Sequence, residues 1–439
     1  MTIGFQQQIY DFLMESQYFS TEDMHHQHMH QLEALIRFAR AQVPFYRTRL
    51  NCIFNSRDEF DFRRWSEVPI LTRKDLLNHN GTMLATNLPP GHGEVHASTG
   101  SGSTGKPVES RHNQLLTLAS QASAFRSFAW HSVDYSRNFF SWFGGGPNVA
   151  RAPTGWKGGP WGPPWNPASA KGKSTAMHHV DPPEAALAFM QQNEAYYVDG
   201  RSHSLQDLAA EALKQRVSHP LGALYSFSTK LNAATRELCK EAFGAPVVDR
   251  YASKEVADIA YQCPSCNNLH VNWELMLLEV LDEDGAPCPI GKMGRIIVTP
   301  FYSTAQPFIR YDLGDYATMG PPCSCGREMP VITEINGRTI HAFILPDGRK
   351  VVPSIFGFVR QTLGTAEWQI AQTAPEVVEL RYVKVCEVEQ VAYDKLSEVI
   401  RSQLTLKTKV IYREMRALPA TPSGKILESV CELPPEAAP

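Results

Sequence analysis

Two helical segments near the middle of the chain are each followed by a short apolar segment, and this alternation constrains the fold most. The helical patterns cover residues 204–215 and 232–243, and the apolar segments are "LGALYSF" and "APVVDRY". Helices that alternate with short buried strands form parallel sheets with crossover helices. We therefore expect an α/β fold with a large N-terminal domain of sheets and crossover helices.

Three further segments have clear patterns. Residues 20–49 have helical spacing of apolar residues, and Pro44 ends the pattern. The stretch "LMLLEVLDEDGAPCPIGKMGRIIVTP" has two β-rich runs around a "DEDG" turn, which predicts a hairpin. Residues 142–167 are crowded with Gly, Pro and Trp, which favours an irregular loop over a helix or strand.

The length of the chain, 439 residues, is too great for one ordinary hydrophobic core. From about Arg338 the pattern changes to strands such as "VVELRYVKV", followed by a helical pattern over 393–404. We therefore predict two domains: a core domain over 1–337 and a small α+β domain over 338–439.

The charge balance excludes one class of partner. The chain has 42 basic and 45 acidic residues and a formal net charge of −3, whereas nucleic-acid binders usually have a basic excess. No apolar run reaches membrane-spanning length, and the first residues lack the basic end and apolar stretch of a signal peptide. We therefore expect a soluble, cytoplasmic protein with no nucleic-acid or membrane partner, whose nine cysteines are free thiols or metal ligands.

The segment "STGSGSTGKPV", Ser98–Val108, has the composition of a phosphate-binding loop. Its glycines let the backbone approach a ligand, its N–H and hydroxyl groups can surround phosphate oxygens, and Lys106 supplies a positive charge. It differs from the P-loop, which needs Ser or Thr where this chain has Pro107. No helical pattern follows Gly105, so the dinucleotide fingerprint also fails. The alternative is a flexible linker.

Four cysteines form two close pairs in turn-like sequence. Cys263 and Cys266 form a C-x-x-C, and Cys323 and Cys325 form a C-x-C. Four thiolates suit a tetrahedral structural zinc, and His270 can replace one cysteine as a ligand. The alternative is a group of buried free thiols. A catalytic zinc is disfavoured, because four cysteine ligands would leave no open metal position.

The phosphate loop resembles that of the adenylate-forming superfamily of acyl- and aryl-CoA ligases, within the branch of phenylacetate-CoA ligase and capsular-ligase-like proteins. Segments similar to that branch follow in the family's order: "ALIRFARAQVPFYRTRL" and "VPILTRKDL", then "YASKEVADIA", "FIRYDLGD", "INGR" and "PATPSGKI". "YASKEVADIA" stands where the family has a Tyr-Gly-x-Thr-Glu motif. The order of these segments, more than any one of them, supports the resemblance.

The resemblance implies roles for residues of these segments. The β- and γ-phosphates of ATP would be held by Thr99, Ser103, Thr104, Gly105 and Lys106, and Ser98 and Gly100 of the same loop would also bind the nucleotide. The adenylate would contact Ser228, Tyr251, Ala252, Ser253 and Lys254. Within this set Tyr251 would lie against the adenine, with Ser228 near it. Glu255 would bind Mg²⁺, and Asp315 would accept hydrogen bonds from the ribose hydroxyls.

Two residues at the end of the chain complete the implied site. Arg338 would sit at a hinge beside the nucleotide, and Lys425 would bridge the reacting carboxylate and the α-phosphate. The resemblance therefore implies a mobile C-terminal domain that carries Lys425, with Glu255 and Lys106 as the other catalytic residues. Two positions depart from the family. Lys254 replaces a threonine that bonds the adenylate phosphate, and His341 replaces the hinge aspartate.

The implied function is an ATP-dependent ligase that forms an acyl-AMP from a small carboxylic acid and transfers the acyl group to the pantetheine thiol of CoA or of an acyl carrier protein. The aromatic segment with Phe139, Phe140, Trp142 and Phe143 favours an aromatic acid, unless these rings are simply core. The implied cofactors are ATP, Mg²⁺ and a structural Zn²⁺, and a homodimer is one assembly to expect. The alternatives are an amide-forming synthetase and a nucleotide-binding protein without catalysis.

Overall fold

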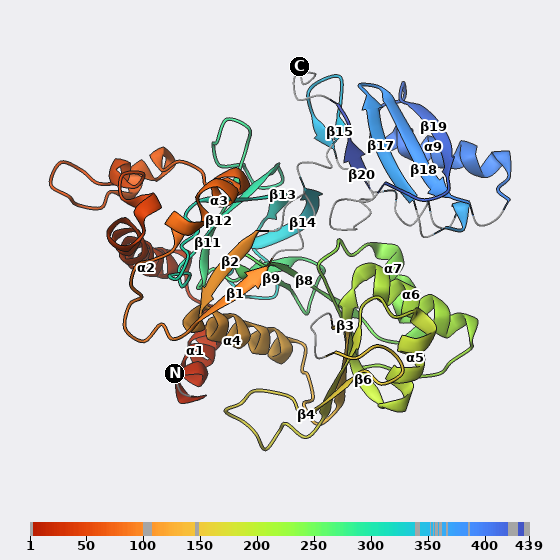
Figure 1. Cartoon of the computed structure of the whole chain (residues 1–439), viewed down its shortest axis with the longest axis horizontal. Coiled ribbons are helices and arrows are strands. Elements are labelled where there is room, and N and C mark those ends of the chain that lie inside the picture. The colour runs from red at the N-terminus through yellow and green to blue at the C-terminus, as the bar shows by residue number, and fades with distance from the viewer. Residues whose placement is uncertain are drawn as a thin grey trace. The chain divides into compact units, whose positions relative to one another are not determined.

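A computed structural model of the chain describes residues 3–99, 108–144, 149–338, 343–351, 368–384, 387–419 and 429–433, with positions 353, 355, 359 and 362–365. The chain forms two compact units (Figure 1). The first comprises Met1–Ser98, Glu109–Leu313 and Ala317–Glu334, and the second comprises Thr99–Val108, Gly314–Tyr316 and Ile335–Pro439. None of the described helices has both the length and the apolar character that a membrane crossing requires.

Twelve strands form the largest sheet. They are β3 (Asn138–Gly144), β4 (Trp156–Pro160), β5 (Lys173–His178), β6 (Ala195–Arg201), β7 (Ala223–Phe227), β8 (Val247–Ser253), β9 (Ala257–Gln262), β10 (Leu269–Val271), β11 (Met276–Leu281), β12 (Met293–Pro300), β13 (Tyr311–Gly320) and β14 (Val331–Arg338). Their order in the sheet is β11-β12-β13-β14-β10-β9-β8-β7-β6-β3-β5-β4.

The parallel part of this sheet comprises β5, β3, β6, β7 and β8. Helices α5 (Pro183–Gln192), α6 (Ser202–Lys214) and α7 (Ala233–Phe243) connect the strands and bury one face of the sheet. The side chain of Asn232 caps α7 by accepting a hydrogen bond from the Thr235 N–H, and Gly244 ends it with φ +66°. The predicted α/β fold class with crossover helices is confirmed.

Helix α4 (Gln114–Trp130) packs on the opposite face of the parallel strands. Its Phe128 meets a cluster of sheet residues that includes Tyr197, Tyr225 and Val248. The side chain of Arg126 on the same helix is fully buried and donates hydrogen bonds to Glu274 at 2.5 Å and to Asn272 at 2.9 Å. Since a buried charge needs such partners, this arrangement fixes the position of α4.

The N-terminal part of the first unit is mainly helical. Its elements are α1 (Ile3–Ser16), α2 (Thr21–Gln42), α3 (Arg73–His79) and the 3₁₀ turns η1 (Pro44–Tyr46), η2 (Asn51–Ile53), η3 (Phe62–Glu67) and η4 (Asn80–Met83). The hydroxyl of Ser20 caps α2 by accepting from the Asp23 N–H, and the helix ends two residues before Pro44, as predicted. Leu32, Ile36 and Ala39 of α2 lie in a buried core.

Two sequence-based expectations for strands have different outcomes. The predicted hairpin is confirmed, because β11 and β12 pair antiparallel from Met276 opposite Pro300 to Leu281 opposite Arg295. The prediction that 142–167 is wholly irregular is wrong, since β3 extends to Gly144 and Trp156–Pro160 forms β4. Strand β4 is at the end of the sheet, where only one neighbour supplies backbone hydrogen bonds and a proline is tolerated.

The second unit contains a small α+β fold, as predicted from the sequence pattern. Strands β17 (Trp368–Ala374), β18 (Val377–Val383), β19 (Lys409–Met415) and β20 (Ser429–Cys431) form a sheet in the order β19-β18-β17-β20. Helix α9 (Gln390–Gln403) packs on this sheet, and its Leu396 and Ile400 share a core with Ile370 and Leu380. A separate pair, β15 (Phe343–Ile344) and β16 (Lys350–Val351), is antiparallel.

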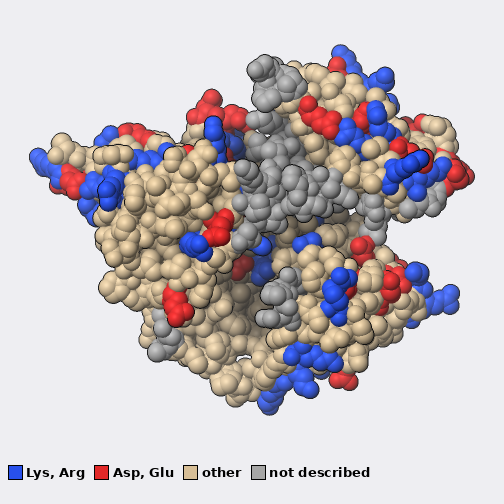
Figure 2. Space-filling model, viewed as in Figure 1, with Lys and Arg blue, Asp and Glu red and all other residues tan. Residues whose placement is uncertain are grey.

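The charged side chains on the face shown in Figure 2 are interspersed by sign. Lys and Arg lie among Asp and Glu rather than in one continuous basic area on this face. This distribution agrees with the formal net charge of −3.

Candidate functional site

The two ends of the phosphate-loop segment are strands. β1 (Val95–Thr99) leads into the segment and β2 (Glu109–Asn113) leaves it, and the two strands pair as a two-stranded sheet. Ser98 lies at the end of β1, and Val108 is buried before β2. The remaining predicted phosphate contacts lie outside the described residues, apart from the backbone of Thr99, and stay predictions: Gly100, Ser103, Thr104, Gly105 and Lys106.

Ser110, the second residue of β2, links the base of this loop to a distant segment. Its hydroxyl oxygen lies 3.2 Å from the carbonyl oxygen of Ser98 and 3.4 Å from that of Lys254. The single hydroxyl proton can therefore serve either carbonyl. The base of the phosphate loop consequently lies beside the residue that precedes Glu255.

Glu255 lies in the turn between β8 and β9, and only 13% of its side chain is exposed. The hydroxyl of Ser253 accepts a hydrogen bond from the Val256 N–H at 3.3 Å and so helps to shape this turn. Nη1 of Arg73, at the start of α3, lies 3.9 Å from a carboxylate oxygen of Glu255. A partly buried carboxylate near Ser98, at the base of this loop, is a suitable ligand for a hard cation such as Mg²⁺.

Two residues near Glu255 were missed by the sequence interpretation. Arg73 lies within "VPILTRKDL", and His112 is the fourth residue after Val108, so both are next to segments that carried the resemblance. Burial lowers the pKa of His112, and Glu255 opposes that shift through a backbone hydrogen bond and its charge. Local sequence showed no reason for either side chain to approach Glu255, because the contacts join segments far apart in the chain.

The remaining residues that are predicted to contact the adenylate lie at one edge of the parallel sheet. Ser228 follows the last residue of β7, while Tyr251, Ala252 and Ser253 are the last residues of β8. Since β7 and β8 are parallel neighbours, these residues all lie at the carboxyl ends of the strands, where open α/β sheets bind ligands. Ser228 has a φ of +71°, an uncommon backbone conformation for a residue other than glycine. The structure therefore brings these residues to the same edge as Lys254 and Glu255.

Three predicted residues lie in the second unit. Asp315 is half-buried on β13 and follows Gly314, which has a φ of +74°. Arg338 is the last residue of β14, and its side chain is outside the described part of the structure. Lys425 lies outside the described residues altogether. The roles of these three residues stay predictions.

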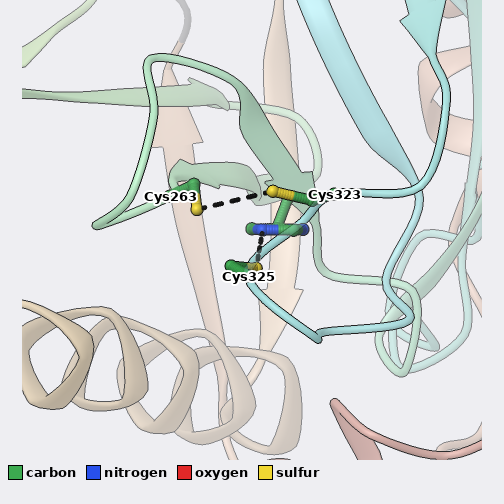
Figure 3. Close-up of side chains that lie close together, drawn as sticks. Cys263, Cys323 and Cys325 are labelled. Atoms are coloured by element: carbon green, nitrogen blue, oxygen red, sulfur yellow. Dashed lines mark hydrogen bonds between the residues drawn. The ribbon is translucent and has the colours of Figure 1, made fainter.

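The predicted cysteine pairs meet in space. Cys263 lies just after β9, and Cys323 and Cys325 lie between β13 and β14. In Figure 3 the side chains of these three cysteines point toward one another, and the Sγ atoms of Cys263 and Cys323 are 3.7 Å apart. His270, on β10, places Nε2 3.3 Å from Sγ of Cys325. The ligand atoms of these four residues all lie within 4.8 Å of one another.

The spacing of these atoms fits a tetrahedral zinc site. With Zn–S bonds of about 2.3 Å, two thiolates of a tetrahedral site lie about 3.8 Å apart. The observed separations are 3.7 Å for Cys263 and Cys323 and 3.8 Å for Cys266 and Cys323. These distances are too long for a disulfide, and all of these cysteines are free thiols. Cys263, His270, Cys323 and Cys325 form the compact set of donors, with Cys266 next to it.

The environment of the cluster differs from thiol to thiol. Burial raises the pKa of Cys263 and of Cys323. Burial acts in the same direction on Cys325, but hydrogen bonds from Arg327 and interactions with neighbouring thiols outweigh it and lower the pKa of Cys325. Burial lowers the pKa of His270 to about 4, which leaves its ring neutral at pH 7.

Comparison with known proteins found one curated relative. The chain is 27% identical over 327 residues to phenylacetate-coenzyme A ligase of Thermus thermophilus, and the match covers 72% of this chain and 70% of the relative. No protein-family model matches the chain.

Solved structures with the same fold include two CoA ligases. A 2-hydroxyisobutyryl-CoA ligase in the postadenylation state has a TM-score of 0.70 at 16% identity, with 95% of this chain and 91% of that chain covered. An anthranilate CoA ligase in complex with anthranoyl-AMP has a TM-score of 0.57 at 15% identity, with coverage of 78% and 67%. At these identities the likeness shows the fold.

Proposed function

Because the chain belongs to the adenylate-forming superfamily of acyl- and aryl-CoA ligases, we propose that it is an ATP-dependent ligase for a small carboxylic acid. The enzyme forms an acyl-AMP and then transfers the acyl group to the pantetheine thiol of CoA. An acyl carrier protein is the alternative source of the same thiol.

One observation supports this proposal most directly: the hydroxyl of Ser110 lies within 3.4 Å of both the Ser98 and the Lys254 carbonyl oxygens. It places the base of a Gly/Ser/Thr-rich loop beside the turn that carries Glu255. A phosphate loop and a buried carboxylate are the two features that a triphosphate with its cation requires.

In the first step, an oxygen of the substrate carboxylate forms a bond to the α-phosphorus of ATP, and the bond to the β-phosphate breaks. Pyrophosphate leaves, held by Lys106 and by the loop hydroxyls of Thr99, Ser103 and Thr104. Both reactants are anions, so the site must supply positive charge and oriented donors. Glu255 would hold Mg²⁺, which would offset the charge of the triphosphate. Lys425 offsets the charge of the carboxylate and the α-phosphate as they approach.

In the second step, the sulfur of the thiol attacks the carbonyl carbon of the acyl-AMP. A C–S bond forms, the bond between the carbonyl carbon and the phosphate oxygen breaks, the thiol proton is lost, and AMP leaves. Lys425 must leave the site before the thiol can enter. We therefore propose that residues 338–439 act as a mobile lid, which brings Lys425 into the site for the first step and moves it away for the second.

An aromatic acid is the proposed substrate class. The curated relative is named for phenylacetate. Phe140 and Trp142 belong to the core between the sheet and α5–α7, so these two rings are structural. Phe139 instead packs in the cluster on the α4 face, and Phe143 lies against Phe227 with ring centroids 4.5 Å apart.

The cysteine cluster holds a structural Zn²⁺ in this proposal. Cys263, His270, Cys323 and Cys325 supply four donors, which leaves no open position for chemistry. The site joins the β9–β10 connection to the β13–β14 connection. Its role is to stabilise the middle of the sheet, where β14, β10 and β9 are neighbours, next to the Glu255 turn between β8 and β9.

An ATP–pyrophosphate exchange screen over diverse carboxylic acids tests the function. We expect exchange with at least one acid, followed by formation of the thioester when CoA is added, detected by mass spectrometry. Parallel reactions with carrier protein and with amines identify the acceptor, and an amide product would favour the amide synthetase instead. If no acid supports exchange, the ligase proposal is wrong.

A further inference from the structure

A second polar site lies within the first unit, on the face of the parallel sheet that α4 covers. A cavity of about 40 Å³ is lined there by Ala124, Ser127 and Phe128 of α4 and by residues of β3, β6, β7, β8 and β9. None of the residues assigned to the nucleotide lines it. The sequence interpretation did not identify this site.

The register of the strands puts one carboxylate among the rings of this face. Asp199 on β6 is paired with Ser141 on β3 and with Tyr225 on β7, so the three side chains point to the same face. The ring of Tyr225 lies 5.2 Å from that of Phe128 and 6.2 Å from that of Phe139, measured between centroids. Asp199 is therefore an acidic side chain in a mainly aromatic wall, and Asp249 of β8 is a second acidic residue of the cavity lining.

Buried polar atoms of this wall have unused hydrogen-bonding capacity. Oδ1 of Asp199 and the hydroxyl of Tyr225 have no hydrogen-bond partner among the described residues, and the same holds for the hydroxyls of Ser226 and Tyr261, which also line the cavity. The hydroxyl of Ser141 bonds the Asp199 carboxyl. Buried polar atoms are normally paired, because leaving them unpaired after removal from water costs stability. An unpaired acceptor and an unpaired hydroxyl on one cavity indicate a ligand group or ordered water between them.

The charge next to Asp199 limits what this group can be. The guanidinium of Arg250 attracts the Asp199 carboxylate, lies 4.7 Å from the ring centroid of Phe227 and is 3.6 Å from Asp258. A positive charge is thus already present beside Asp199. The best complement to the free Oδ1 is a neutral hydrogen-bond donor, and the Tyr225 hydroxyl can donate to the same group.

The cavity is adjacent in the chain to the proposed nucleotide site. Phe227 lines the cavity and the next residue is Ser228, while Arg250 lines it and the next residue is Tyr251. The cavity therefore lies just behind the strand ends where the acid must meet ATP. Since one water needs about 10–15 Å³, a cavity of about 40 Å³ holds a small polar substituent rather than a complete aromatic acid.

We propose that Asp199 and Tyr225 recognise a neutral hydrogen-bond donor, a hydroxyl or an aromatic amine, on the part of the acid substrate away from its carboxylate. This inference rests on the ligase function proposed above. The ligase then prefers substituted acids to the matching acids without the donor. A site built to bond a substrate hydroxyl discriminates strongly, because the analogue that lacks it leaves buried polar groups unpaired. The two residues thus determine specificity without contacting the reacting carboxylate.

The test is ATP–pyrophosphate exchange with matched acids: phenylacetate and benzoate against their hydroxy and amino derivatives, and propionate against lactate. We expect a preference of at least about ten-fold in kcat/KM for one substituted acid over its unsubstituted partner. Tyr225→Phe removes one oxygen atom and should reduce this ratio at least several-fold, and Asp199→Leu should reduce it further. Tyr197→Phe is the matched control, since Tyr197 is on the same sheet face but its hydroxyl accepts from the Asp134 N–H.

The outcomes separate this inference from the proposed function. Equal or better exchange with every unsubstituted acid would overturn the recognition role and leave a water-filled structural cavity. A preference for the substituted acid that stays the same in Tyr225→Phe would also overturn the recognition role. Absence of exchange with any acid would instead overturn the ligase function on which the inference rests. If Asp199→Leu fails to fold, the far milder Tyr225→Phe variant, checked by circular dichroism, decides the question.

Discussion

The hydroxyl oxygen of Ser110 lies 3.4 Å from the carbonyl oxygen of Lys254, although 144 residues separate the two in the sequence. This contact joins the strand that leaves the phosphate loop to the turn that carries Glu255. It brings together two segments whose functions were assigned separately.

Glu255→Gln should lower the rate of ATP–pyrophosphate exchange by about 10²–10³-fold, in the range seen when one electrostatic contact to a transition state is removed. The amide keeps the shape of the side chain but loses the charge that suits Mg²⁺, so the variant should also need more Mg²⁺ for half-maximal exchange. Exchange rates measured across a Mg²⁺ titration check both effects. Glu334→Gln is the control, because Glu334 pairs with Lys230 in an exposed position. Unchanged Mg²⁺ dependence in Glu255→Gln would contradict the cation role.

Lys425→Ala should abolish pyrophosphate exchange while the melting temperature stays unchanged. The side chain is expected to neutralise charge only when the reactants are bound, so its removal affects the rate and not the fold. Exchange and thermal unfolding measured on the same preparation check this. Lys395→Ala, on the exposed side of α9, is the matched control. Normal exchange in Lys425→Ala would exclude the role assigned to Lys425.

Elemental analysis should find about one zinc per chain. Cys323→Ser should lose the metal and lower the melting temperature, since Sγ of Cys323 is next to both Cys263 and Cys266. Cys288→Ser should keep the zinc, because Cys288 bonds the Met293 carbonyl oxygen away from the cluster. A stable protein without metal would refute the zinc site.

The fourth ligand can be identified with a second pair of variants. His270→Asn should lose zinc if the compact set of four donors binds the ion, while Cys266→Ser should keep it. Loss of zinc in Cys266→Ser but not in His270→Asn would instead identify the four cysteines as the zinc ligands.

Asp199→Asn should gain stability relative to the unmodified chain as the pH rises from about 4 to 7. Burial raises the pKa of Asp199 to about 6, with Ser141 and Arg250 acting in the opposite direction. Between the unfolded and folded pKa values the folded state holds more protons, so the free energy of unfolding falls as the pH rises. Asparagine does not titrate, so the variant avoids this loss in the free energy of unfolding, which is on the order of 1–3 kcal/mol. Urea unfolding of both proteins at pH 4.5 and pH 7.5 measures the difference, with Asp394→Asn on α9 as control. If the two proteins differ in free energy of unfolding by the same amount at both pH values, the pKa of Asp199 is not raised in the folded state.

Elements with local signals were predictable from the sequence. Asn232 and Gly244 mark both ends of α7, and the two β-rich runs of the hairpin needed only their own spacing and turn. Strand β4 could not be predicted, because it forms by pairing with β5 and its own residues are mostly poor strand formers.

The site shows the same division. The cysteine pairs stood out by residue type and spacing, and Glu255 was identified through the resemblance of its segment to a family motif. Arg73 and His112 did not, because their positions depend on contacts between distant segments. Asp199 interrupts the apolar pattern of "AYYVDGR", which was the available signal for the cavity. Only the pairing of β6 with β3 and β7 shows which way that side chain points.

The buried ion pair of Arg126 and Glu274 has a consequence for how the substrate range of this enzyme can evolve. Arg126 holds α4 in place, and the same helix supplies Ala124, Ser127 and Phe128 to the cavity. Loss of one partner of such a pair leaves an uncompensated charge in the interior, so drift at these two positions is strongly opposed. Ala124 and Phe128 can change without disturbing that anchor. New acids should therefore be acquired through substitutions on one face of a helix whose position stays constant.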